Sequence, residues 1–303
     1  MEKEVQNDYR KYLDPAVVSR LASLELKSKY IVEGFMLGLH RSPYHGFSIE
    51  FSQHRPYMQG DAPKDIDWKV YGKTDRYFVK QYEEETNLKV HILMDCSHSM
   101  SFAYNNRIPK FEYGAMLAAA LAYLSIHQKD AAGITLYASE IIKSLLPRAS
   151  GIYLNELLKA IANAKVEGKT NSGKCLSLIA EKINRRGLVI IISDFFDDPA
   201  STISALKHFR FTRDEVIVFQ ILDPIEMSFA FGGDATFVDM ESGEEMHTRP
   251  YHLQKVYGDA MQEFTGKLKK ECLAGGIEYN LINTEMPFDK ALFSYLQKRS
   301  RLG

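Results

Sequence analysis

The sequence predicts an α/β fold: a Rossmann-like, three-layer sandwich with a central, mostly parallel sheet. In the C-terminal two-thirds of the chain, short runs rich in Val, Ile, Leu and Tyr alternate with longer segments of helical periodicity. Such alternation is typical of successive βαβ units, which build a parallel sheet. The runs are apolar almost throughout, as expected for strands that helices cover on both faces. We therefore expect one such domain over residues 88–303, preceded by a distinct N-terminal segment, residues 1–87.

The apolar runs between the helical segments are the expected strands. Ile141–Leu146 follows Gly133–Tyr137 after only a short turn, so we expect these two strands to pair antiparallel. The strands expected to form the parallel part of the sheet are Val90–Met94, Gly133–Tyr137, Leu188–Ser193, Glu215–Ile221 and Glu278–Ile282.

Helical patterns fill the intervals between these strands. Lys110–Gln128 is rich in Ala and Leu, with apolar residues at helical spacing, which predicts a buried helix. Pro250–Leu273 opens with a proline suited to a first helical turn and ends before a pair of glycines. The other expected helices are Ile152–Asn163, Lys174–Asn184, Ala200–Phe209 and Asp289–Lys298.

The N-terminal segment has too little apolar sequence for a core of its own, so we expect an extension that docks on the main domain. Asp14 followed by Pro15 is a good N-cap with a first-turn proline, which predicts the start of a helix. Strands are expected at Phe47–Phe51 and Tyr77–Tyr82. The apolar positions expected to form the buried stripe of the helix are Val17, Leu21, Leu24 and Ile31.

Composition and charge argue against several classes of protein. The 303 residues carry a formal net charge of −1, which gives no general attraction to nucleic acid or to anionic lipid. The N-terminus is acidic and lacks the apolar stretch of a signal peptide. The longest apolar runs are far shorter than the ~20 residues of a membrane helix. The three cysteines show neither a paired framework nor zinc spacing. A reduced, cytoplasmic protein without a membrane span is expected.

Three hard oxygen ligands follow the strand Val90–Met94 on a single loop. Asp95 comes directly after the strand, and Ser97 and Ser99 follow at alternating positions. Open α/β sheets form their binding crevices at the carboxyl ends of strands. Oxygen ligands of this kind suit Mg²⁺, Mn²⁺ or Ca²⁺ and suit soft metals poorly. The loop therefore predicts a divalent cation at this edge of the sheet.

Two other loops are expected to complete the cation site. A turn-rich loop before the helix Lys174–Asn184 presents Thr170, and Asp194 follows the strand Leu188–Ser193. Both lie at the same edge of the predicted sheet as Asp95. The alternative is structural, because aspartate and serine also cap helices and close turns. The meeting of three loops favours the metal site.

These residues resemble the metal-ion-dependent adhesion site of von Willebrand factor A domains. The resemblance implies that Ser97, Ser99 and Thr170 are inner ligands and that Asp95 and Asp194 are the anionic support. It also implies that an acidic side chain of a partner protein supplies the last ligand. The chain departs from the pattern after Asp194, where Phe195 stands in place of the usual glycine. Binding of Mg²⁺, or of Mn²⁺ or Ca²⁺, is expected to be weak without the partner's carboxylate.

A second set of motifs consists of Phe47–Phe51, Arg55–Tyr57, Gly60-Asp61, Asp65–Trp68 and, near the C-terminus, Leu292–Leu296. This set resembles a narrower group, the domain-of-unknown-function family numbered fifty-eight. The resemblance covers almost the whole chain and implies a partnership with MoxR-type AAA+ ATPases in assembly, maturation or stress response. The acidic part of these motifs could itself form a second site, but a polar network holding a glycine turn, with Trp68 as its apolar anchor, is the favoured interpretation. The residues of that network are Arg55, Asp61, Asp65, Asp67 and Trp68.

Three classes of function remain open from the sequence. A non-enzymatic adaptor is favoured, in which the metal site captures an acidic side chain of a partner protein. A metal-dependent hydrolase would use the ion to activate water, but the sequence offers no convincing general base or nucleophile–base pair and hence no catalytic residues. A structural subunit with a vestigial metal pocket is the third possibility.

Overall fold

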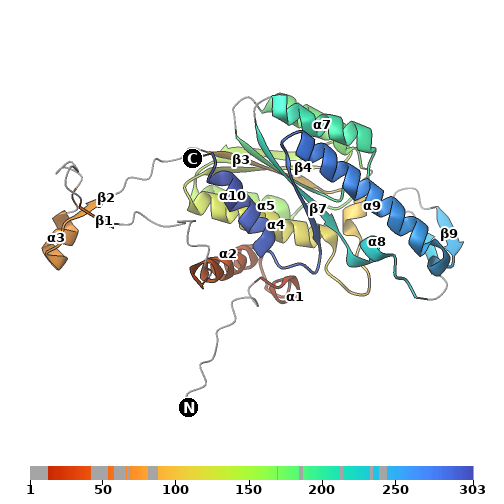
Figure 1. Cartoon of the computed structure of the whole chain (residues 1–303), viewed down its shortest axis with the longest axis horizontal. Coiled ribbons are helices and arrows are strands. Elements are labelled where there is room, and N and C mark those ends of the chain that lie inside the picture. The colour runs from red at the N-terminus through yellow and green to blue at the C-terminus, as the bar shows by residue number, and fades with distance from the viewer. Residues whose placement is uncertain are drawn as a thin grey trace, which may run out of the picture.

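The computed structural model describes residues 13–41, 54–57, 66, 68–80, 88–168, 170–183, 187–211, 214–232, 235–238 and 244–302. A six-stranded sheet forms the centre of the fold (Figure 1). Every neighbouring pair in it is parallel except β4 and β5, which are antiparallel. The predicted fold class is therefore confirmed, with each strand within a few residues of its expected range. In spatial order the strands are β10 (Glu278–Asn283), β7 (Glu215–Leu222), β6 (Leu188–Ser193), β3 (Lys89–Asp95), β4 (Ala131–Tyr137) and β5 (Ile141–Arg148).

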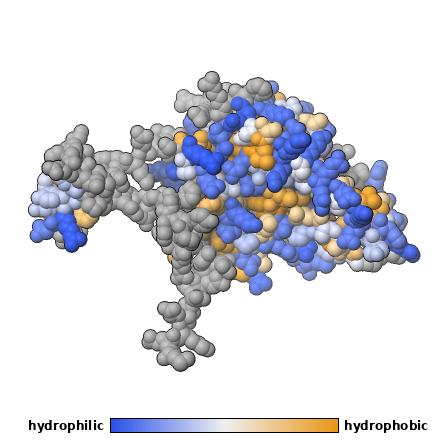
Figure 2. All heavy atoms as spheres, in the orientation of Figure 1, coloured by the Kyte–Doolittle hydropathy of each residue, from blue (hydrophilic) through white to orange (hydrophobic). Residues whose placement is uncertain are grey.

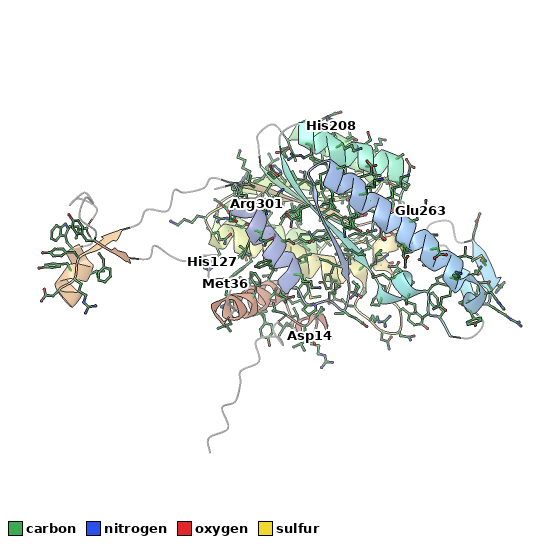
Figure 3. The ribbon with its side chains drawn as sticks, in the orientation of Figure 1. Asp14, Met36, His127, His208, Glu263 and Arg301 are labelled. Atoms are coloured by element: carbon green, nitrogen blue, oxygen red, sulfur yellow. The ribbon has the colours of Figure 1, made fainter. Side chains whose placement is uncertain are left out.

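Helices cover both faces of the sheet and give the three layers. On β6, Ile190 and Ile192 pack into the core beneath α4, α5 and α10, whereas Val189 and Ile191 pack into the core beneath α6, α7 and α9. Figure 3 labels His208 on α7 and Glu263 on α9, the two neighbouring helices of the second layer. The helices are α4 (Lys110–His127), α5 (Gly151–Ala162), α10 (Asp289–Arg299), α6 (Ser172–Lys182), α7 (Pro199–Phe211) and α9 (Pro250–Ala274).

In residues 13–41 the structure describes two helices, α1 (Pro15–Val18) and α2 (Leu24–Arg41), where the sequence predicted one continuous helix. The prediction was wrong because Ser23 starts a second helix: its Oγ accepts a hydrogen bond from the Leu26 backbone N–H at 3.2 Å. The predicted stripe also changes, since Val17 is 37% exposed.

The buried face of α2 packs against α4. Ile31, Val32 and Phe35 join the same core cluster as the inner residues of α4. In Figure 3, Met36 on α2 and His127 at the end of α4 mark these two helices. Part of the N-terminal segment therefore contributes to the core of the sheet domain. The domain boundary at residues 87 and 88 stays a prediction.

A small unit follows α2 along the chain. The strand β1 (His54–Pro56) pairs antiparallel with β2 (Phe78–Lys80), and α3 (Trp68–Thr74) lies between them in sequence. The described residues of β2 confirm part of the strand expected at residues 77–82, of which 81 and 82 lie outside the described residues. Trp68, the expected apolar anchor of the polar network, is 59% exposed. The expected strand at residues 47–51 and the carboxylates of the expected network, Asp61, Asp65 and Asp67, lie outside the described residues, as does the side chain of Arg55.

An insertion that the sequence did not predict connects β7 to α9. It contains α8 (Pro224–Ser228) and the hairpin of β8 (Ala235–Val238) and β9 (Glu245–Thr248). Stacked aromatic rings connect this insertion to the first half of α9. The ring centroids of Phe229 and Tyr257 are 4.1 Å apart, and those of Phe229 and Phe237 are 5.3 Å apart. Figure 2 shows hydrophobic residues at the surface of the end of the molecule where Figure 1 labels β9. Among the described residues, no helix has both the length and the apolar character that crossing a bilayer requires.

The strand β5 forms one edge of the sheet and is irregular. Its pairing with β4 shifts register twice, between Ala132 and Ile134 and between Leu136 and Tyr137. Gly133 lies at the first shift, where a Cβ would meet the Leu145 carbonyl oxygen at 2.5 Å. Glycine is therefore required at this position by the close approach of the neighbouring backbone.

Candidate functional site

Asp95 ends β3 near the centre of the sheet, and its buried side chain organises the loop that follows. One carboxylate oxygen accepts a hydrogen bond from the Ser97 backbone N–H at 2.8 Å. The other accepts one from the Ser193 hydroxyl, at the end of the neighbouring strand β6, at 2.6 Å. Asp95 thus connects the ends of β3 and β6 by hydrogen bonds. It therefore has the turn-closing role that was the alternative to metal binding.

The hydroxyl groups of Ser97 and Ser99 lie side by side, with their Oγ atoms 3.1 Å apart. Ser97 precedes a short 3₁₀ helix, η3 (His98–Ser101), but its side chain makes no capping hydrogen bond. Its hydroxyl is therefore not used as a helix cap. Adjacent ligands of an octahedral Mg²⁺ ion with bonds of ~2.1 Å are about 3 Å apart, which matches the separation of these two oxygen atoms.

The loop that carries Thr170 lies against the loop after β3. The His98 backbone N–H donates to the Gly168 carbonyl at 3.1 Å, and the Glu167 N–H donates to the Cys96 carbonyl at 3.1 Å. Gly168 has φ of +90°, a conformation that favours glycine. Thr170 follows this turn and is half-buried. The structure therefore places this loop against the loop after β3.

The start of α6 extends this part of the site. The Ser172 backbone N–H donates to the Asp197 carboxylate at 2.6 Å. The Ser172 hydroxyl is buried and has no hydrogen-bond partner within the part of the chain that the structure describes. An oxygen with unused capacity therefore lies two residues from Thr170.

Asp194 is buried at the end of β6, as expected, and its loop turns without a glycine. Phe195 adopts φ of +59° and donates its backbone N–H to the Ser193 hydroxyl at 2.9 Å. Phe196 N–H donates to one Asp194 carboxylate oxygen at 3.1 Å. The departure from the adhesion-site pattern is thus accommodated by a left-handed phenylalanine, a conformation that is costly for a side chain of this size.

Lys110 occupies the other oxygen of Asp194, a contact that the sequence did not predict. Its Nζ lies 2.8 Å from Asp194 Oδ2 and 2.6 Å from Glu226 Oε1, and the lysine side chain is fully buried. The ammonium also lies 4.8 Å from the centre of the Phe196 ring. Burial alone would lower the pKa of Lys110, but the charges of Asp194 and Glu226 outweigh it and raise the pKa, so the lysine is charged at neutral pH.

One signal in the sequence pointed toward Lys110. It is the first residue of α4, a position where the partial positive charge of the helix N-terminus disfavours a cation. A lysine there calls for nearby carboxylates. The sequence alone could not name them, because Asp194 and Glu226 are 84 and 116 residues away.

The proximity of two carboxylates perturbs the ionisation of Asp95. Burial, and then the charge of Asp194, raise the pKa of Asp95 from 3.8 to about 7. Burial, and then the charge of Asp95, also raise the pKa of the Cys96 thiol to about 12. Cys96 is accordingly a neutral core side chain, as expected from the sequence.

The donor set fits a hard divalent cation in part. Ser97 and Ser99 have suitable separation, Asp95 stands behind them, and the unused oxygen of Ser172 lies near Thr170. Asp194, in contrast, is already engaged by Lys110. Within the described residues, no three His, Cys, Asp or Glu side chains form a metal cluster, so hydroxyl oxygens would have to supply much of the coordination. The direct ligands stay a prediction.

Comparison with protein families gives one match that spans most of the chain. The family model described as "Protein of unknown function DUF58" matches residues 53–261. Uncharacterized proteins of Mycobacterium bovis and Mycobacterium tuberculosis are 26% identical over 233 residues, which cover 76% of this chain and 73% of theirs.

The solved structures that a comparison found similar include two from Bacteroides species. The conserved hypothetical protein BatB of Bacteroides thetaiotaomicron is 16% identical, with a TM-score of 0.48, over 71% of this chain and 98% of that one. An aerotolerance-related membrane protein of Bacteroides fragilis is 18% identical, with a TM-score of 0.49, over 71% of this chain and 99% of that one.

Proposed function

The chain belongs to the family described as protein of unknown function DUF58, and on that premise we propose that it is a metal-dependent protein-interaction module. The chain has a von Willebrand factor A-like fold, a type of fold that serves as a protein-interaction module. The proposed ion is Mg²⁺ or Mn²⁺, held by Ser97, Ser99 and Thr170 with Asp95 behind them. An acidic side chain of a partner protein would complete its coordination.

The observation that carries this proposal is the pair of serine hydroxyls beside the buried carboxylate of Asp95. Neutral hydroxyl ligands leave most of the ion's charge uncompensated, so the ion attracts an incoming carboxylate. Ser97 and Ser99 occupy one loop with a separation that an octahedral ion can span. A partner that binds one conformation of the site more tightly than another would shift the population of protein molecules toward that conformation.

The partner that we propose is a MoxR-type AAA+ ATPase or a client of such an ATPase, in the cytoplasm, acting in assembly, maturation or stress response. This choice of partner follows from the resemblance of the sequence motifs to that family. The ATPase would supply nucleotide hydrolysis, and this chain would supply the docking surface.

Metal titration tests the site. We expect Mn²⁺ to bind the whole chain in isothermal titration calorimetry and electron paramagnetic resonance, and Ser97→Ala with Ser99→Ala to weaken binding by at least about tenfold, ~1.4 kcal/mol. Ser204→Ala, at an exposed position of α7, is the matched control and should bind as the native protein does. Equal binding by the native chain and the double variant would contradict the site.

Capture experiments test the partner. The native chain, immobilised, should retain a purified MoxR-type ATPase in Mg²⁺ and release it when a chelator is added. The double serine variant should retain little in either condition. Retention that is indifferent to both the chelator and the variant would show that the contact does not depend on the metal.

A further inference from the structure

Both carboxylate oxygens of Asp194 are already used by the protein itself. Oδ1 accepts the Phe196 backbone N–H at 3.1 Å, and Oδ2 accepts from Lys110 Nζ at 2.8 Å. Lys110 and Asp194 are both fully buried. A charge-assisted hydrogen bond between two buried ions is stronger than its exposed counterpart because water does not compete for either group.

Lys110 is also held from its other side. Its second partner, Glu226, belongs to the capping box of α8: Glu226 Oε2 accepts the Asp223 backbone N–H at 2.7 Å, and Asp223 Oδ1 accepts the Ile225 N–H at 2.8 Å. Arg107, which lies three residues before Lys110, donates a hydrogen bond from Nη1 to Asp223 Oδ1 at 3.1 Å. The ammonium is therefore fixed between the loop after β6 and α8.

We propose that Lys110 is the resident counter-ion of Asp194 and keeps this carboxylate from coordinating a divalent cation at the hydroxyl site. The inference deepens the proposed function and rests on its metal site. It departs from the adhesion-site pattern, in which the final aspartate supports the ion.

The physical reason is a competition between two cations for one carboxylate. For Asp194 to turn toward a metal, Lys110 would lose one of its two buried partners. Glu226 alone would then balance the buried charge of Lys110, and removing one partner of a buried ion pair is strongly destabilising. A weakly held divalent ion does not offset such a cost, so it binds through the hydroxyls and Asp95, and a carboxylate from outside completes the site.

The consequence is that removing the ammonium should create a tighter metal site. We would replace Lys110 together with its second partner, as Lys110→Met with Glu226→Gln, so that only one charge, Asp194, is left unpaired. We expect this variant to bind Mn²⁺ about tenfold or more tightly than the native chain, as measured by electron paramagnetic resonance of free Mn²⁺. Lys207→Met with Glu271→Gln is the matched control, since Lys207 and Glu271 form an ion pair of 2.7 Å at the surface.

A second substitution identifies the ligand. Asp194→Asn should change the Mn²⁺ affinity of the native chain by less than about twofold, but should reverse the gain in the Lys110→Met, Glu226→Gln background. Loss of binding on Asp194→Asn in the native chain would overturn the inference, because Asp194 would then be a ligand despite Lys110. The native-background comparison remains decisive even where the Lys110 variant does not fold.

The outcomes separate this inference from the proposed function. Tight Mn²⁺ binding by the Lys110 variant alone would support the inference and contradict the proposed metal dependence of the native chain. Equal binding by both chains would overturn the inference and leave the proposed function intact. Binding by neither would overturn both.

Discussion

At the scale of single residues, the most consequential group is Asp95, a carboxylate buried beside a second carboxylate. Its pKa of about 7 lies well above its ordinary 3.8 because burial and the charge of Asp194 both disfavour ionisation. Between these two values the folded state holds a proton that the unfolded state has lost. The fold therefore becomes less stable as the pH rises through this interval.

Asp95→Asn should remove this pH dependence. Both proteins are measured in the presence of a chelator. As the pH rises from about 4 to about 7, the unfolding free energy of the native chain should fall by about 2–4 kcal/mol relative to that of Asp95→Asn. Denaturant unfolding at a series of pH values measures the difference. Parallel stability curves for the two proteins would contradict the prediction.

The comparison must be made between these two proteins because another group opposes Asp95. Burial, and then the charge of Lys89, lower the pKa of His91 from 6.5 to about 4. Its folded state lacks a proton that the unfolded state holds in that interval, so His91 makes the fold more stable as the pH rises. The difference between native chain and variant cancels this contribution.

At the scale of secondary-structure elements, α6 and α7 approach each other closely next to the site. A Cβ on Gly173, in the first turn of α6, would overlap the Ser201 side chain and lie 2.9 Å from the Ser201 backbone carbon. Gly173 lies three residues after Thr170, so the position of α6 also sets the position of that loop.

Gly173→Ala should therefore force the two helices apart. We expect a loss of about 1–3 kcal/mol in unfolding free energy, as for other overpacked sites, and weaker Mn²⁺ binding through displacement of the Thr170 loop. Adding Ser201→Gly should restore part of the stability. Gly151→Ala is the control, because a Cβ there meets nothing within 4 Å. If Gly173→Ala proved as harmless as this control, the packing described for α6 and α7 would be wrong.

Elements differ in how far the sequence predicted them, and the reason is the range of the interactions that determine them. The strand Leu188–Ser193 is apolar at nearly every position because both of its faces are buried, so local composition suffices. The short hairpin of β8 and β9 has exposed positions and no continuous pattern. The positions of Asp95 and Asp194 follow from the ends of two strands, and Thr170 lies in the loop before α6. The Lys110–Glu226 contact, in contrast, depends on how distant segments pack.

At the scale of the whole molecule, the N-terminal helix α2 is part of the core. Phe35 is buried in the cluster that α2 shares with α4, whereas Leu37, two residues further on, is 45% exposed. The sheet domain therefore does not close its own apolar face completely.

Phe35→Ala should lower the unfolding free energy by about 3–5 kcal/mol, because it removes a buried ring and leaves a cavity. Leu37→Ala on the same helix should cost about 0.5 kcal/mol or less. Thermal and denaturant unfolding of the whole chain measure both. Equal, small effects would mean that α2 does not dock on α4, against the expectation that the N-terminal segment extends the main domain.

The irregular edge strand β5 bears on how the protein behaves at high concentration. An exposed edge presents unpaired backbone groups to which a strand of another molecule can bind, the first step of aggregation. The two register shifts twist β5 away from a flat geometry, and it carries Lys143, Pro147 and Arg148 along its length. Proline lacks the N–H that a new strand would need, and the two cations on β5 repel a second copy of the same edge. Pairing of two molecules edge to edge through β5, and hence growth into fibres, is therefore disfavoured.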